Sequence, residues 1–382
     1  MRKKTGIIYV LIMALVVLLN VIAWNSTAFC DAYIRYVFPI WVNTYGRLTG
    51  VFPFSVGEIL LAAGVLCVVV FVLCILLCMM LGVYSLLTSQ GNTPGKIRNG
   101  LWKFSKGYFC FFAWTVLIVC LIMTLNCTIL YHASTFSEQY YGEEDGDYTL
   151  DDLIAVRNMV VERCNKMAQE MERDENGDLV YRGDIKSEAI KAMKKLGKQY
   201  DQLDGYYPRP KPLASSDFFS QQYSCGYYFP FSMEANYNNV MYIGNFPSTM
   251  CHELAHLRGY IYEDEANFIS FLACIQSEDP FFQYCGYLNV LYYLDNDLYA
   301  AVGYDKYWEE IWIDPQVHMD NVFLKQEEWN RIEEEAPLDT EVVEAVSDEF
   351  VDTMLKVNGV EDGMISYSRV VELLLWYYSH EQ

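Results

Sequence analysis

Residues 59–87 read ILLAAGVLCVVVFVLCILLCMMLGVYSLL, a run of 29 residues without a charged side chain. About 20 consecutive apolar residues are enough to carry an α-helix across the hydrocarbon core of a bilayer. Two further uncharged, largely apolar runs, 6–24 and 107–130, come close to or exceed this length. We therefore expect an α-helical, multi-pass membrane region over residues 1–130, with three transmembrane helices at about 6–24, 59–87 and 107–130.

The run 6–24 has a second interpretation, a cleaved signal peptide, because basic residues precede it. Its apolar stretch is longer than the roughly 7–15 residues of a signal sequence, and no small-residue cleavage site follows it cleanly. We therefore favour a retained helix.

Charge divides the chain at the same place. The whole chain has a net charge of −22, but residues 1–130 carry nine basic and two acidic side chains, whereas residues 131–382 carry 18 basic and 47 acidic ones. Binding to phosphate backbones needs a basic surface, so a nucleic-acid partner is excluded on electrostatic grounds. A lipid bilayer is the partner that the first part predicts.

The short loops that are rich in lysine and arginine predict the orientation of the spans. Arg2, Lys3 and Lys4 precede the first span, and 96–106 contains four basic residues between spans two and three. Such segments stay on the cytoplasmic side. The interpretation is a multi-pass protein of the cell membrane with a cytoplasmic N-terminus and an extracytoplasmic region 131–382. The aromatic segment 25–58 would then lie at the outer membrane interface or beneath the outer domain.

The pattern of residues 131–382 predicts a mainly α, α+β domain. Thr149 can cap a helix whose apolar residues recur at helical spacing, and a second helix is expected over 185–203. The aromatic segment 226–238 favours a strand, with Pro230 indicating a sheet edge. Pro247-Ser248 then favours a helix with Ser248 as its N-cap.

That last helix contains His252-Glu-Leu-Ala-His256, the HExxH pattern. Residues four apart project from one helix face, so both imidazoles can bind one Zn²⁺ ion. Glu253 would lie beside the metal, where it could hold a water molecule and act as general base. The cofactor prediction is therefore Zn²⁺.

The third ligand has several candidates. Glu263 opens the next helix after a break at Gly259, and Asn267, four residues on, would share its helix face and could hold a liganding side chain in place. Glu265 is the alternative, on a different face of that helix, and a distant histidine such as His318 is a further one. Ordinary acidic residues of a helix N-terminus would look the same.

A peptidase also needs a donor for the oxyanion that develops on the substrate carbonyl. Tyr287, Tyr367 and Arg369 are candidates for this role or for substrate binding, although a tyrosine in a chain with 31 of them more often packs than reacts. The segment Glu234-Ala-Asn236, shortly before the HExxH helix, is a candidate edge for binding substrate.

Several segments resemble known families. The Glu-x-x-Ala-Asn element after HExxH is similar to that of the glutamate zincins, in which the first glutamate ligates zinc. The chain more closely resembles a bacterial family of uncharacterised membrane proteins, numbered 3810 among domains of unknown function. The segments that carry this resemblance are 53–58, 226–236, 251–259, 263–268 and 355–371. Arg258 departs from many zincins, which have an apolar residue at that position.

The resemblance implies a zincin-like, membrane-anchored zinc metallopeptidase that hydrolyses a peptide or an envelope protein on the outer face of the membrane. The alternative is a non-enzymatic envelope sensor or assembly factor built on a zinc-bound zincin scaffold. An intact Glu253 favours the enzyme, because a scaffold has no need of a carboxylate beside its metal.

Overall fold

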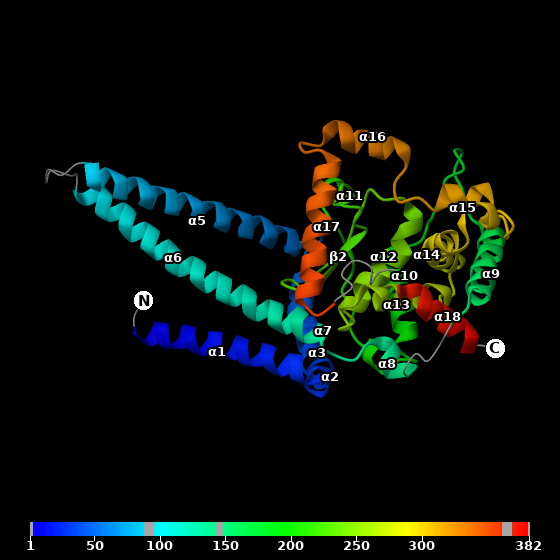
Figure 1. Ribbon diagram of the computed structural model, residues 1–382, viewed down its shortest axis with the longest axis horizontal. Helices are drawn as coiled ribbons and strands as arrows, with labels where there is room; N and C mark the ends of the chain where they lie inside the picture. The colour runs from blue at the N-terminus through cyan, green and yellow to red at the C-terminus, as the bar shows by residue number, and fades with distance from the viewer. Residues whose placement is uncertain (1–2, 88–94, 143–147, 361–368, 381–382) are drawn as a thin grey trace.

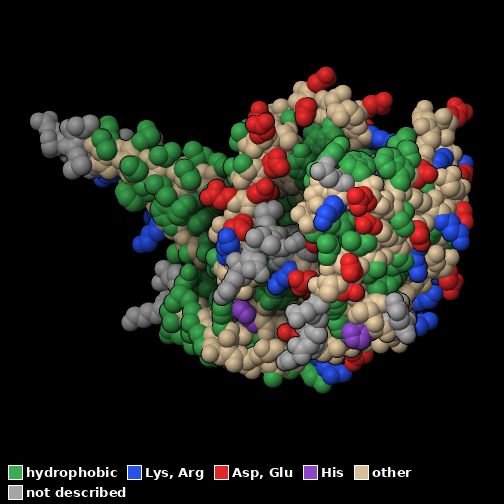
Figure 2. Space-filling view, turned by 45° about the vertical axis from the view of Figure 1, so that its right-hand side comes forward, with side chains coloured by type: hydrophobic (Ala, Val, Ile, Leu, Met, Phe, Trp, Pro, Cys, Tyr) green, Lys and Arg blue, Asp and Glu red, His purple; other side chains and the backbone are tan. Residues whose placement is uncertain are grey.

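The computed structural model describes residues 3–87, 95–142, 148–360 and 369–380. Three long helices extend to one side of a compact, mostly helical body (Figure 1). Hydrophobic side chains cover the surface of the long helices, whereas acidic side chains are spread over the body (Figure 2). The two parts predicted from the charge pattern are therefore visible as two parts of the molecule.

The long helices are α1 (Lys3–Asn25), α5 (Val56–Leu87) and α6 (Gly95–Met123). The last continues through a π-helical turn, η2 (Thr124–Thr128), into α7 (Ile129–Tyr131). All three are long and apolar enough to cross a membrane, which confirms the three predicted spans. The third begins earlier than predicted, because the basic segment before residue 107 continues the helix instead of forming a loop.

Polar contacts hold the spans together at several heights. The Asn20 side chain of α1 donates to the Thr124 hydroxyl at 2.8 Å, and the Tyr108 hydroxyl of α6 donates to the Cys67 carbonyl of α5 at 2.7 Å. Packing and such hydrogen bonds are what associates helices in lipid, where burial of apolar surface contributes little.

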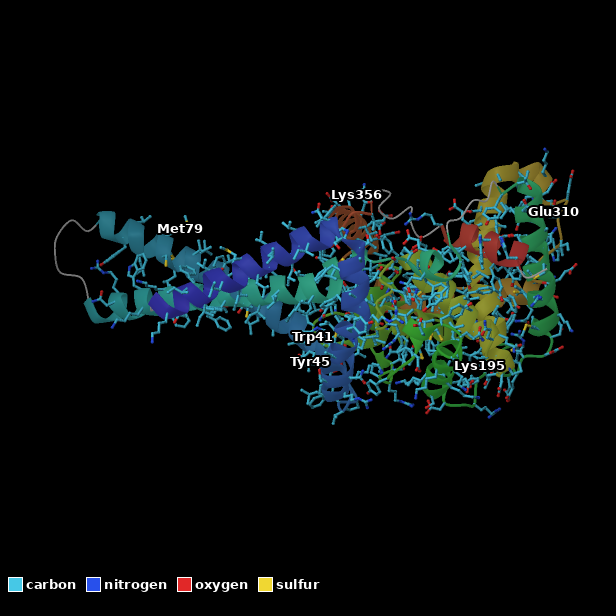
Figure 3. All side chains as sticks on the ribbon, turned by 90° about the horizontal axis from the view of Figure 1, so that it is seen from below. Trp41, Tyr45, Met79, Lys195, Glu310 and Lys356 are labelled. Atoms are coloured by element: carbon cyan, nitrogen blue, oxygen red, sulfur yellow. The ribbon has the colours of Figure 1, made fainter. Side chains whose placement is uncertain are left out.

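Short helices link α1 to α5 at the base of the body. They are α2 (Thr27–Tyr36), α3 (Phe38–Trp41), η1 (Val42–Gly46) and α4 (Arg47–Thr49). Their buried residues join the same apolar core as those of the body, as Ile34 and Phe38 do. Figure 3 shows Trp41 and Tyr45 of this segment where the spans meet the body. The core therefore crosses the boundary predicted at residue 130.

The body is a helical assembly around the buried helix α13 (Glu263–Ile275), which packs against α12 (Phe246–His256), α14 (Pro280–Tyr307) and α10 (Ile185–Leu196). Phe268 and Phe271 of α13 are fully buried. The remaining elements of the body are α8 (Phe136–Tyr140), α9 (Leu150–Ala168), η3 (Asp201–Leu203), α11 (Ser216–Ser220), η4 (Ile243–Asn245), α15 (Pro315–Asp320), α16 (Gln326–Glu335), α17 (Thr340–Val357) and α18 (Val370–His380).

A small sheet lies between α12 and the spans. Its strands are β1 (Lys211–Pro212), β2 (Gly226–Phe229) and β3 (Glu234–Tyr237), in the order β1-β3-β2. β2 and β3 are antiparallel, with Phe229 opposite Glu234. The single strand predicted over 226–238 is therefore wrong. Pro230, which cannot donate to a ladder, lies in the turn of a hairpin, and Met233 has a positive φ of 54° there.

Two helix boundaries also differ from the sequence predictions. The helix expected over 185–203 ends at Leu196, and a separate 3₁₀ turn follows at Asp201–Leu203. Gly197, next to Leu196, has so little room that an added Cβ would meet the Leu203 carbonyl at 2.8 Å. The HExxH helix starts at Phe246, so Ser248 is not its N-cap and instead donates to the Cys285 carbonyl. Thr149 does cap α9, as predicted.

Buried polar contacts attach the β2–β3 hairpin to α4, to the start of α5 and to η2. The Glu234 carboxylate accepts from the backbone N–H groups of Val56 and Gly57, at 3.2 and 2.8 Å, and pairs with Lys211. Thr49 donates to the Ser232 carbonyl at 2.8 Å. Asn126 of η2 donates to the Pro230 carbonyl at 2.7 Å. The sheet is therefore fixed to the membrane helices on one side and packs against α12 on the other.

Candidate metal centre

Helix α12 supplies two imidazoles from one face. Pro247 lies in its first turn, where a missing N–H costs nothing, and the apolar residues around the HExxH pattern are fully buried. His252 and His256 are four residues apart, and their ring centroids lie 4.6 Å from each other. The helix therefore presents both rings to the same space, as the spacing predicts.

The chain then turns back toward these rings. Gly259 has a φ of +95°, and a Cβ there would approach Ile34 of α2 to 2.7 Å, so glycine is needed for both its conformation and its size. Four residues later, Glu263 opens α13. The Glu263 Oε2 atom lies 2.9 Å from His252 Nε2 and 3.8 Å from His256 Nε2. Among the described residues, these three side chains form the one group whose donor atoms suit a metal ion, all within 4.8 Å of one another.

The hydrogen bonds behind the two rings fix which nitrogen can bind a cation. His256 Nδ1 lies 2.8 Å from the Tyr260 carbonyl, which can only accept, so Nδ1 carries the proton. His252 Nδ1 lies 2.9 Å from the Oδ1 atom of Asn267, which accepts in the same way. The Nε2 atom of each ring is then the one turned toward Glu263. The structure thus places Asn267 behind His252, in the position of the groups that usually orient a metal-binding imidazole.

The protonation of the group also suits a cation. Burial lowers the pKa of His252, but the hydrogen bond and negative charge of Glu263 raise it more, to about 9. Burial lowers the pKa of His256 to about 4, so this imidazole is neutral at pH 7. A proton shared by His252 and Glu263 therefore occupies the place where a divalent ion would satisfy all three side chains, and two imidazoles with a carboxylate are a typical zinc donor set.

Glu253 lies next to this group and makes no hydrogen bond through one oxygen. Its side chain is buried, and its Oε2 atom has no partner among the described residues. Burial raises the pKa of Glu253 to about 8, with the charge of Glu263 adding to the shift and His252 opposing it. Strand β2 passes so close that a Cβ at Gly226 would meet Glu253 Oε1 at 2.5 Å. A buried carboxylate oxygen without a hydrogen-bond partner is costly, which is typical of a functional site.

The structure separates the two candidates for the third ligand. Glu265 points away from the histidines and accepts hydrogen bonds from the Ser137 hydroxyl, at 2.6 Å, and from its N–H. Burial raises the pKa of Glu265 to about 7. His318 lies on α15, beside a separate pocket formed with α14. Only Glu263 reaches both imidazoles.

The other candidate residues lie outside the group. Tyr287 is buried against Phe271, and its hydroxyl is bound by Arg163. Arg369 pairs with Asp264 at 3.1 Å, on the side of α13 away from Glu263 Oε2. Tyr367 lies outside the described residues.

The segment proposed as a substrate edge is placed differently from the expectation. Glu234 and Asn236 belong to the central strand β3, and Glu234 points toward the spans. β2, the strand beside Glu253, is one of the two edge strands of the sheet, and β1 is the other.

Two tyrosines that the sequence did not single out lie beside the His-His-Glu group. Tyr293 of α14 receives a hydrogen bond from Asn267 at 3.3 Å, and burial raises its pKa. Tyr227 of β2 is 42% exposed, yet its surroundings raise its pKa to about 12, first through desolvation and then through Cys127, Glu253 and Glu263. Nothing in the sequence distinguishes them from the other tyrosines, since their position depends on how α14 and β2 pack.

Arg258, which departs from the zincin pattern, has a structural role here. Its guanidinium donates to the Gln202 carbonyl at 2.9 Å and to the Asp204 carbonyl at 2.5 Å. It therefore holds the turn after η3 against the end of α12 and leaves the metal-ligating face untouched.

The fold and the site define a mostly helical protein with three membrane-length helices and a partly buried His-His-Glu group beside the buried Glu253. Residues 33–375 match the family described as "Protein of unknown function (DUF3810)". Because this match covers most of the chain, the protein belongs to that family, as the resemblance suggested. No curated protein and no solved structure matches the chain.

Proposed function

We propose that this protein is a membrane-anchored, zinc-dependent peptidase with a zincin-like body. The observation that carries the proposal is the position of Glu253, which is buried, with its Oε2 atom unpartnered among the described residues, beside the group formed by His252, His256 and Glu263. A site that only bound metal for stability would have no use for this carboxylate.

The chemistry is hydrolysis of a peptide bond. A bound zinc ion would supply Lewis-acid activation of water and of the substrate carbonyl. Glu253 takes a proton from the attacking water as its oxygen bonds to the carbonyl carbon, and gives that proton to the leaving amine as the C–N bond breaks. Tyr227 and Tyr293 are the nearby hydroxyl groups that can donate to the carbonyl oxygen as it becomes negative.

We also propose that the body lies on the outer face of the cytoplasmic membrane. The first turn of α1, the last turn of α5 and the first turn of α6 all lie at the end of the spans that is far from the body (Figure 1). The basic residues Arg98, Lys103 and Lys106 belong to that end. Basic segments are retained in the cytoplasm, which supports an extracytoplasmic body. We expect a phosphatase fused at residue 90 to be inactive and a phosphatase fused at the C-terminus to be active.

The test of the metal site uses the full chain in detergent, because the core includes residues from both sides of position 130. We expect one zinc ion per wild-type chain, and loss of zinc in His252→Ala, His256→Ala and Glu263→Ala. Glu265→Ala and His318→Ala are the controls that retain it. Zinc at the wild-type level in both α12 histidine variants would overturn the site.

Glu253→Gln separates the enzyme from the alternative, a sensor or assembly factor on a metal-bound scaffold. The enzyme predicts that this variant binds zinc normally but has lost Glu253-dependent cleavage of a peptide library. Equal cleavage by wild type and variant would remove the general base. A zinc-bound wild type that cleaves nothing would favour the scaffold.

A further inference from the structure

The depth of the metal centre relative to the bilayer follows from where the spans become polar. Glu58, in the first turn of α5, accepts hydrogen bonds from the N–H groups of Ala214 and Ser215, both at 2.9 Å. Asn126, near the end of the third span, is buried against the hairpin. An ionised carboxylate is costly inside hydrocarbon. The hydrocarbon core of the bilayer therefore ends, on the side of the body, at or before the level of Glu58 and Asn126.

Exposed aromatic side chains mark the same level. Tyr36, Trp41, Phe52 and Phe54 of the segment between α1 and α5 are all more than a third exposed, at the base of the body. Trp41 and Tyr45 lie at the junction of spans and body in Figure 3. Aromatic rings concentrate at the headgroup layer, where one end is apolar and the other wet. Two independent features therefore place the membrane interface at the base of the body.

The metal-ligating residues stand directly above this level. Tyr131, the last residue of the third span's helix, accepts a hydrogen bond at 2.6 Å from Tyr262, the residue before Glu263. A helix rises 1.5 Å per residue, so Asn126 and Tyr131 are separated by about 8 Å along its axis. The polar layer of a bilayer is itself about 5–8 Å thick on each side. The metal centre therefore lies at the depth of the lipid headgroups or just above them.

Strand β2 connects the two levels. At one end, Gly226 touches Glu253. At the other end, Phe229 packs against the start of α5, where a Cβ at Gly57 would approach its ring to 2.4 Å. The strand is four residues long, or about 13 Å. A polypeptide paired along β2, which is one of the two edge strands of the sheet, would thus run from the catalytic residues to the membrane surface.

We propose that the substrate is the juxtamembrane segment of a membrane-anchored polypeptide, cut within about ten residues of its anchor. This inference rests on the proposed peptidase function and names the substrate class of the same site. A soluble protein, or a loop far above the bilayer, could reach this site only by entering between the base of the body and the lipid headgroups.

The placement is tested without any substrate. Benzoylphenylalanine is introduced in place of Tyr227 or, as the control, of Tyr304. Tyr304 is 64% exposed and belongs to α14, a helix on the side of the body opposite the spans (Figure 1). The full chain is reconstituted in phosphatidylcholine vesicles with biotinylated phosphatidylethanolamine and illuminated. We expect at least tenfold more lipid adduct at position 227. Equal labelling at both positions would overturn the inference.

The substrate class is tested with three reporters that carry the same randomised ten-residue segment. In the first, the segment follows a single transmembrane helix directly; in the second, a folded domain separates the two; the third has no anchor. We expect cleavage of the first at least tenfold faster than of the others, and its loss in Glu253→Gln. Equal, Glu253-dependent cleavage of all three would overturn this inference and leave the peptidase standing. No Glu253-dependent cleavage of any reporter would overturn the peptidase itself, and this inference with it.

Discussion

Helices α5 and α13 are both rich in apolar residues, yet they use them in opposite ways. On α5, Val65 and Met80 are 65% and 70% exposed, and the single charge lies in its first turn. On α13, Phe268 and Phe271 are fully buried, and even the carboxylates of Asp264 and Glu265 are less than a tenth exposed. The first helix meets a solvent as apolar as itself, whereas the second organises a protein core that encloses charge. Buried charge thus distinguishes the body of this molecule, and exposed apolar surface distinguishes its spans.

The sharpest test of this contrast is the charge pair where the two parts meet. Lys211 and Glu234 are both almost fully buried, so Lys211→Met would leave a buried carboxylate without its counter-ion. We expect a loss of about 3–5 kcal/mol of stability. The measurement is thermal unfolding of the full chain in detergent. The double variant K211M/E234Q should recover most of the loss, and a single variant as stable as wild type would show that the pair carries no such cost.

The same substitution in the two helices compares their surroundings directly. Leu272 of α13 is fully buried, and Leu272→Ala should cost about 2–5 kcal/mol through the cavity it leaves. Leu66 of α5 is 62% exposed, and Leu66→Ala should cost less than about 0.5 kcal/mol, because lipid or detergent tails fill the space. Melting temperatures in one detergent provide the comparison. Similar losses at both positions would contradict the assignment of α5 to a lipid environment.

Within the core, Asn267 tests whether the buried polar groups serve the metal. Asn267→Ala removes the acceptor behind His252 and should weaken zinc binding about 10- to 100-fold. Asn267→Asp, which keeps an acceptor oxygen, is the matched control. Affinity is measured by competition with a chelator of known strength. An alanine variant with wild-type affinity would mean that His252 needs no support from this residue.

The smallest effect is expected for an ion pair that is exposed to solvent. Arg35 of α2 pairs with Asp201 at 2.9 Å, but both side chains are about two-thirds exposed. Arg35→Ala should cost less than about 1 kcal/mol, and less still in high salt. The buried Arg157, which pairs with Asp295 at 2.7 Å, provides the contrast, and its replacement by alanine should be several times more damaging. The reverse order would show that burial does not govern these pairs.

The sequence was sufficient to predict the spans and the grouping of His252, His256 and Glu263, because both depend on local spacing. Uninterrupted apolar runs predicted α1 and α5, and the four-residue period of a helix predicted that His252 and His256 share a face. The break at Gly259 indicated correctly that the chain turns back, and the structure brings Glu263 to both rings.

What depends on packing between distant segments could not be read in this way. An aromatic run with one proline looked like a single strand, because the turn at 230–233 has no Asn-Gly or Asp-Gly signal. Tyr227 and Tyr293 reach the site only through the placement of β2 and α14. Glu234 looked like a cleft residue, since nothing local indicates that its partners are the N–H groups at the start of a helix 177 residues earlier.

The attachment of the hairpin also bears on how the chain folds during synthesis. Thr49, Val56 and Asn126 all precede the hairpin in the sequence, so the groups that receive it have been translated before residue 226 emerges. Domains generally fold from the N-terminus as they are made. The inserted helices can therefore act as a template on which the strand beside Glu253 takes its shape. On this view the strand beside Glu253 takes its final shape only on chains that have already reached the membrane.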